Sequence, residues 1–225
     1  MRCDRILPHP VKSTLATTQN MIDRQATSLI RPALDSLGRR LVRHGVSADA
    51  LTFTGLAVGW AAAVAIALQA FGIGAALILA SRLFDGLDGA VARATTPTDR
   101  GGFLDISLDF LFYPAIPLAF AIANPVANAL AAAVLLAAFV GTGTCFLAFA
   151  TIAAKRGLTS VDYPDKSFYF LGGLAEATET LVFFIAMCLW PQHFAQLAFL
   201  FAAMCAITIV TRIFWGWQAF RPNND

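Results

Sequence analysis

Four aspartates lie at regular spacing within strongly apolar stretches of this 225-residue chain. Asp85 and Asp88 are three residues apart and Asp105 and Asp109 are four apart, so each pair shares one face of a helix. Only a short connection separates the two helices, which makes them antiparallel neighbours and lets the pairs converge. Carboxylate oxygens suit Mg²⁺, Mn²⁺ or Ca²⁺, and two such ions would balance four charges. We therefore expect a metal site that also holds substrate phosphate.

The surroundings make these charges costly. Hydrophobic residues form 58% of the chain and charged residues only 13%, against about 25% charged residues in soluble domains. A charge near the centre of a membrane helix costs roughly 2.5–3.5 kcal/mol, so four at mid-depth would cost on the order of 10 kcal/mol. Other groups in the folded protein must therefore offset the cost of burying these carboxylate charges. The net charge of +2 gives no reason to expect nucleic acid, and the four cysteines show no metal-binding spacing.

The elements that must position the aspartates are membrane helices. We expect an all-α polytopic membrane protein with six transmembrane helices preceded by an amphipathic juxtamembrane helix. The expected organisation is an irregular segment over 1–18, an amphipathic interfacial helix over 19–45, a six-helix transmembrane catalytic domain over 46–220 and a cytosolic tail over 221–225. The apolar runs place the spans near 49–70, 73–94, 102–123, 126–154, 169–190 and 193–218.

Basic residues predict the orientation of these helices. Eight Lys and Arg residues precede the first expected span, and every second connection carries further basic residues while the others carry none. This alternation places both termini and the aspartates on the cytosolic side. Arginines also fill one face of the 19–45 segment, which suits a helix lying on anionic membrane lipids. An ordinary solvated helix is the alternative for that segment.

The spacing around the aspartates resembles the signature of the class I CDP-alcohol phosphatidyltransferase family. The matching positions are Asp85, Asp88, Gly89, Ala92, Arg93, Gly101, Asp105 and Asp109. One departure is that seven residues separate Arg93 from Gly101, where the family usually has eight. This shortening bears on the nucleotide contacts rather than on the metal cage. The stretches GGFLDISLDFLFY and KSFYFLGGL are similar to a bacterial inner-membrane branch of the family whose acceptor is unassigned.

The resemblance implies a metal-dependent enzyme of the EC 2.7.8 type in phospholipid biosynthesis. It would move a phosphatidyl group from a CDP-alcohol such as CDP-diacylglycerol to an acceptor hydroxyl and release CMP. The four aspartates would hold two Mg²⁺ or Mn²⁺ ions, with Asp109 also acting as the base. The CDP-alcohol contacts would come from Gly89, Ala92, Arg93, Asp49 and Thr52. Helix capping by Ser47 or Asp49 is the alternative for Asp49 and Thr52. A cytosolic anchor is the alternative for Arg93. The resemblance further implies a homodimer in the bacterial inner membrane.

The acceptor site and the function class leave alternatives open. Lys166, Glu176 and Glu179 are candidates for acceptor binding, since ionisable residues inside a membrane are functional by default. A polar patch satisfied by Arg212 is the alternative for the glutamates. Arg82, one turn before Asp85, is interpreted as its structural ion-pair partner, and the Gly-Thr-Gly-Thr run at 141–144 as a close-packing notch. A membrane prenyl transferase, a cation-coupled transporter and a silent scaffold are the rival functions.

Overall fold

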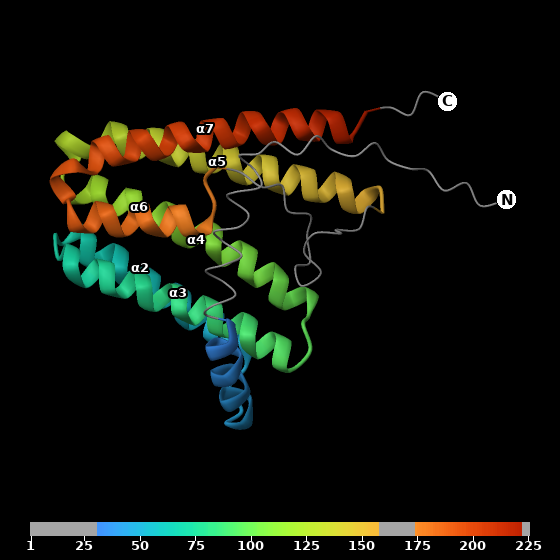
Figure 1. Cartoon of the computed structure of the whole chain (residues 1–225). Coiled ribbons are helices and arrows are strands. Elements are labelled where there is room, and N and C mark those ends of the chain that lie inside the picture. The colour runs from blue at the N-terminus through green and yellow to red at the C-terminus, as the bar shows by residue number, and fades with distance from the viewer. Residues whose placement is uncertain (1–30, 158–173, 222–225) are drawn as a thin grey trace.

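The computed structural model describes residues 31–157 and 174–221, and within these ranges it is helical with no strand. Residues 31–43 form a helix that lies before the main bundle. The following helices are α2 (Ala48–Ala67), α3 (Phe71–Ala94), α4 (Asp99–Ala123), α5 (Pro125–Lys155), α6 (Ala177–Leu189), the 3₁₀ helix η1 (Pro191–His193) and α7 (Phe194–Ala219). The all-α prediction is confirmed for this part of the chain (Figure 1).

The expected spans and the observed helices agree within four residues at each end for five of the six. The exception is the span expected over 169–190. Its first residues, 169–173, lie outside the described ranges, and 174–176 are not helical. Helix α6 begins only at Ala177, because Glu176 and Glu179 form a capping box that sets the helix start. The expected span was therefore wrong at its N-terminal end.

Four of the helices are long and apolar enough to cross a membrane: α2, α4, α5 and the stretch Pro191–Ala219. Helix α6 is shorter, with 13 residues. Helix α3 has 24 residues, but it carries Arg82, Arg93 and the first aspartate pair. Large apolar side chains also point outward over much of the bundle, among them Val126, Leu130 and Trp217. An apolar exterior of this kind suits lipid rather than water.

The helices lie in a bundle in which α2 packs most extensively against α3, and α5 against α7 (Figure 1). The core between them is aromatic. Phe120 of α4 stacks on Phe194 of α7 with ring centroids 4.5 Å apart, and Phe112 and Phe201 are buried nearby. The 141–144 run is confirmed as a notch, since a Cβ at Gly143 would collide with the ring of Phe110. Helix α4 packs mainly against α2 and α5, and a side-chain ion pair joins it to α3.

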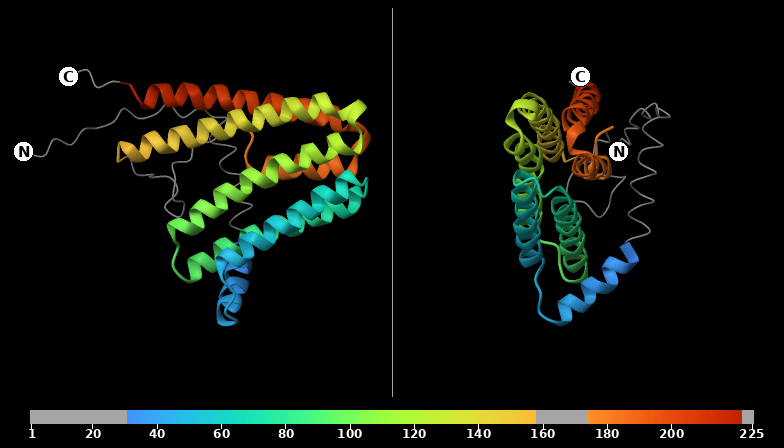
Figure 2. Two further views of the ribbon diagram at one scale, coloured as in Figure 1. Left: turned by 180° about the vertical axis from the view of Figure 1, so that it is seen from behind. Right: turned by 90° about the vertical axis from the view of Figure 1, so that its left-hand side faces the viewer.

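The helix over 31–43 runs crosswise to the bundle, at the end where α3 ends and α2 and α4 begin (Figure 2). Its apolar side packs on α3: Leu34 lies over Gly86, and a Cβ at Gly38 would come 2.9 Å from the backbone of Ala90. Leu41 and neighbouring residues complete this second apolar cluster. The apolar face of this helix is therefore largely covered by the protein itself, and Arg39, Arg40 and Arg43 are exposed.

Candidate metal and phosphoryl-transfer site

Three of the four aspartates from the two helices converge. Asp85 of α3 and Asp105 and Asp109 of α4 each offer a carboxylate oxygen, and these oxygens all lie within 4.8 Å of one another. Helix α4 begins where it does because Thr98 caps it, with its hydroxyl oxygen accepting from the amide of Gly101 at 3.1 Å. Because α4 begins at Asp99, Asp105 and Asp109 lie in its second and third turns.

Asp88 lies about one turn after Asp85 on α3 and lines the same cavity, although it is not one of the three converging carboxylates. Its side chain is buried, and its Oδ2 atom has no hydrogen-bond partner among the described residues. Thr52 of α2 lies beside this carboxylate. A buried acceptor without a partner is costly unless something else satisfies it. Asp88 therefore needs a cation or a donor that the described side chains do not supply.

A small cavity lies between these carboxylates. It has a volume of about 10 Å³, and its lining residues are Thr52, Gly55, Leu56, Arg82, Asp85, Asp88, Asp105, Leu108 and Asp109. A volume of this size holds about one water-sized sphere. The donors are hard oxygens, one of them is unsatisfied, and the space suits a single small ion. On these three observations the residues fit a divalent cation such as Mg²⁺ or Mn²⁺.

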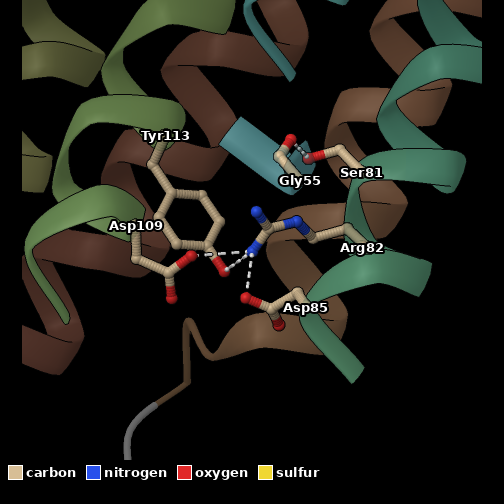
Figure 3. Close-up of polar contacts among 6 residues, drawn as sticks. All are labelled: Gly55, Ser81, Arg82, Asp85, Asp109 and Tyr113. Atoms are coloured by element: carbon tan, nitrogen blue, oxygen red, sulfur yellow. Dashed lines mark hydrogen bonds and ion pairs between the residues drawn. The ribbon is translucent and has the colours of Figure 1, made fainter. Parts of the chain in front are cut away.

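Arg82 reaches into the same group of carboxylates (Figure 3). Its Nη1 atom lies 2.8 Å from Oδ1 of Asp109 and 3.4 Å from Oδ1 of Asp85, and 3.5 Å from the hydroxyl of Tyr113. The guanidinium also lies 4.1 Å from the centre of the Phe112 ring. The expected ion pair with Asp85 is confirmed, and a shorter one joins α3 to α4 through Asp109.

Small residues on α2 make room for this arrangement. A Cβ at Gly59 would collide with the ring of Phe112, so Phe112 lies against α2 only because Gly59 has no side chain. One turn earlier, the hydroxyl of Ser81 donates to the carbonyl of Gly55 at 2.7 Å and ties α3 to α2 (Figure 3). The position of the Arg82 guanidinium therefore depends on close packing of three helices.

Arg93 and Gly89 lie together at the end of α3. A Cβ at Gly89 would come 3.2 Å from Nη1 of Arg93, so the guanidinium lies over the glycine. The Nη2 atom of Arg93 forms an ion pair of 2.9 Å with Asp35, which also pairs with Arg31 at 3.8 Å. Arg93 is partly exposed, and Ala92 lies beside it on the same turn. The arginine is thus held near the surface, one turn beyond Asp88.

Asp49 and Thr52 lie at the start of α2. Ser47 is the N-cap residue, since its side chain accepts from the amide of Ala50 at 3.2 Å. Asp49 instead forms an ion pair with Arg100 in the first turn of α4. Of the two residues named for capping, Ser47 supplies the cap and Asp49 does not. Thr52 lines the cavity next to Asp88.

The acceptor candidates lie on another element. Glu176 and Glu179 form the capping box of α6, in which the amide of Glu176 donates to Oε2 of Glu179 at 3.2 Å. Arg212 of α7 donates to the carbonyl of Thr142 at 3.1 Å and is close enough to Glu176 to attract it. Lys166 lies outside the described residues. Both glutamates thus have a structural role at this helix end, whatever else they contact.

Sequence reasoning missed two partners of the site. Tyr113 follows Asp109 by four residues, so the helical period already places it on the same face. Asp35 carries no comparable signal, since its distance from Arg93 in the sequence is long and its helix could have docked elsewhere. The contact depends on the docking of this helix on α3, where Gly38 lies against Ala90.

Comparison with known proteins adds the following relatives. The chain is 48% identical over 201 residues to the inner membrane protein YnjF of Escherichia coli (strain K12), covering 89% of this chain and 98% of that protein. It is 29% identical over 208 residues to the archaetidylinositol phosphate synthase of Methanothermobacter thermautotrophicus, covering 88% of this chain and 95% of that one.

Two crystal structures of the phosphatidylinositol phosphate synthase PgsA1 of Mycobacterium tuberculosis share the fold. The structure with CDP-DAG bound has a TM-score of 0.68 at 23% identity and covers 85% of this chain and 98% of that chain. The structure in complex with manganese and citrate has a TM-score of 0.66 at 24% identity, and the match covers 84% of this chain and 92% of that chain.

The family model described as CDP-alcohol phosphatidyltransferase matches residues 46–213, the stretch that contains all four aspartates. That match spans well over half of the chain, and a relative of nearly equal length is 48% identical to it. The chain therefore belongs to the CDP-alcohol phosphatidyltransferase family.

Proposed function

We propose that this protein transfers a phosphatidyl group from a CDP-linked lipid such as CDP-diacylglycerol to an acceptor hydroxyl, with release of CMP. The observation that carries the proposal is the convergence of carboxylates from α3 and α4 around one cavity. The chain belongs to a family of phosphatidyltransferases, and this supports group transfer as the reaction at the cage. The relative whose structure contains CDP-DAG supports a CDP-lipid as the donor.

The cage would hold Mg²⁺ or Mn²⁺, with two ions in the loaded enzyme. Asp85, Asp105 and Asp109 offer converging oxygens, and Asp88 offers a buried one. When bound, the metal withdraws charge from the diphosphate of the donor. The related synthase that was crystallised with manganese supports a divalent ion in this fold.

The residues of the chain itself supply the rest of the chemistry. Asp109 accepts the proton of the acceptor hydroxyl, whose oxygen then bonds to the β-phosphorus of the donor. The bond from that phosphorus to the bridging oxygen breaks, and CMP leaves with the electron pair. Arg93, lying over Gly89, contacts the phosphates and stabilises the negative charge on the departing CMP. Catalysis of this kind rests on positioning and charge stabilisation.

The donor's nucleotide would lie outside the small cavity, since a volume of about 10 Å³ admits no nucleotide. The partly exposed surface formed by Gly89, Ala92 and Arg93 is the adjoining place, with Thr52 and Asp49 at the start of α2 on the other side. The acceptor would approach from α6, whose capping box contains Glu176 and Glu179. Lys166 is the third candidate for acceptor binding. A hydroxyl-rich or amino-bearing head group suits the two carboxylates.

In the membrane, we propose six spans, with α3 and the segment around α6 added to the four helices that meet the length and hydropathy requirement. Both termini and the aspartate cage face the cytosol in this arrangement. The segment over 19–45 lies at the surface of the bacterial inner membrane and contacts anionic lipids through its arginines. The outward apolar side chains of the bundle support burial in lipid. The enzyme is a homodimer in this proposal.

The test is CMP release from CDP-diacylglycerol by the purified protein in mixed micelles, with MnCl₂ or MgCl₂ and a panel of acceptors. We expect metal-dependent CMP release with one acceptor and formation of the matching phospholipid. Absence of CMP with every acceptor and both metals, from a protein that remains folded, would contradict the proposal. Cation uptake into proteoliposomes under the same conditions would favour the transporter instead.

A further inference from the structure

We infer that Arg82 is a fixed counter-charge of the aspartate cage, which makes full metal loading depend on the donor's diphosphate. The inference deepens the proposed function and rests on it. Arg82 lies outside the eight positions that match the family signature, so the signature assigns it no role. Its assignment comes from the geometry around Asp85 and Asp109.

The guanidinium contacts the same carboxylates that offer oxygens to a metal. Nη1 lies 2.8 Å from Asp109 and 3.4 Å from Asp85, on two different helices. Both carboxylates also belong to the group whose oxygens lie within 4.8 Å of one another. A positive charge at this place neutralises part of the cage and repels any divalent ion that enters it. Arg82 therefore affects metal binding directly, and not only the packing of α3 on α4.

Packing holds the guanidinium in place. The Phe112 ring lies 4.1 Å below it and the Tyr113 ring 5.4 Å away, and only 17% of the side chain is exposed. Its Nε atom is buried without a hydrogen-bond partner among the described residues. Phe112 in turn is pressed against Gly59. An arginine enclosed in this way cannot easily turn out to water, and its charge is permanent near neutral pH.

Charge balance then gives the consequence. Four carboxylates and Arg82 together carry three negative charges, so one divalent ion leaves the site slightly negative, whereas two leave it positive. The diphosphate of a CDP-lipid brings about two further negative charges and restores the balance. The second ion should therefore bind tightly only together with the donor. By linkage, the donor should bind more tightly when metal is present, by the same factor.

The test measures Mn²⁺ binding directly, by the EPR signal of free Mn²⁺, in micelles without acceptor and hence without turnover. For the wild type we expect CDP-diacylglycerol to raise the affinity of the weaker Mn²⁺ site at least tenfold, which corresponds to about 1.4 kcal/mol. In Arg82→Gln, that site should bind Mn²⁺ at least tenfold more tightly without donor, and the donor should add little. Arg82→Lys, which keeps the charge, should resemble the wild type.

The Mn²⁺ affinity of Arg82→Gln distinguishes a counter-charge from a purely structural role of Arg82. If Arg82 only held the helices together, Arg82→Gln would bind Mn²⁺ equally or more weakly without donor, and that result would overturn the inference. The wild type alone gives a second check that requires no variant: Mn²⁺ affinity unchanged by CDP-diacylglycerol also overturns it. Mn²⁺ binding that survives Asp88→Asn and Asp105→Asn unchanged would overturn the proposed cage itself, and the inference with it.

Discussion

Arg93 at the end of α3 and Asp35 in the helix over 31–43 form an ion pair of 2.9 Å. The pair joins a residue of the family signature to an element that precedes the matched region of the chain. Gly38 and Leu34 seat the same helix on α3, so Asp35 is held in register with Arg93. The crosswise helix therefore helps to position the arginine that we assign to the donor's phosphates.

Replacing Asp35 with Asn should raise the KM for CDP-diacylglycerol about threefold to tenfold with little change in kcat. Without its partner, Arg93 must be ordered when the donor binds, which costs roughly 0.5–1.5 kcal/mol for one long side chain. Steady-state kinetics at saturating acceptor measure this effect. Ser36→Ala on the exposed neighbouring position is the matched control, and an unchanged KM in Asp35→Asn would argue against a positioning role.

Replacing Asp109 with Asn should lower kcat by about a hundredfold to ten-thousandfold, the range for loss of a general base. The protein should still fold and insert, because the amide retains nearly the same shape. Single-turnover CMP release with donor and metal saturating is the measurement, since saturation separates loss of the base from weaker binding. Wild-type turnover in this variant would rule out Asp109 as the base.

Replacing Gly59 with Val should reduce both stability and activity. The added side chain would displace the Phe112 ring, at a cost of about 1–3 kcal/mol for an overpacked core. Because Arg82 lies on that ring, its contacts with Asp109 should also shift. Thermal unfolding in detergent and CMP release report the two effects. Gly72→Ala is the control, because a Cβ there meets nothing within 4 Å; equal behaviour of the two variants would contradict the packing argument.

Replacing Glu176 with Ser separates capping from acceptor binding. Serine is a good N-cap residue, so thermal stability should stay close to that of the wild type, whereas Glu176→Ala should lose about 0.5–2 kcal/mol. If the glutamate lines the acceptor pocket, Glu176→Ser should still raise the acceptor KM severalfold. Kinetics at saturating donor decide the matter. An acceptor KM that does not move in the serine variant would leave capping as the whole role.

Sequence predicted most of the fold because the apolar runs are long and end at polar or proline residues. Pro125 begins α5 and Pro191 follows α6, and both boundaries were visible. The spacing of Asp85, Asp88, Asp105 and Asp109 predicted the convergence, since the helical period and a short loop leave few alternatives. The start of α6 was not predictable from hydropathy, because a capping box between two glutamates decides it.

Contacts between helices were harder to predict than the helices themselves. The spacing of Arg82 and Asp85 predicted their pairing, but the shorter contact with Asp109 depends on how α4 is rotated against α3. The pairing of Asp49 with Arg100 likewise depends on where Thr98 starts α4. Such details follow from packing among three helices, and one-dimensional patterns do not contain them.

The link between Arg82 and Asp109 also bears on how the chain enters the membrane during synthesis. Helix α3 emerges from the ribosome with a buried arginine whose nearest carboxylate lies on α4, which has not yet been made. A lone α3 would carry Arg82 into lipid with Asp85 of its own helix but without Asp109, its closer partner, at a cost of several kcal/mol. In the proposed six-span arrangement we therefore expect stable insertion of α3 to wait for α4, so that the two helices enter the bilayer as one hairpin and the aspartate cage assembles in the same step.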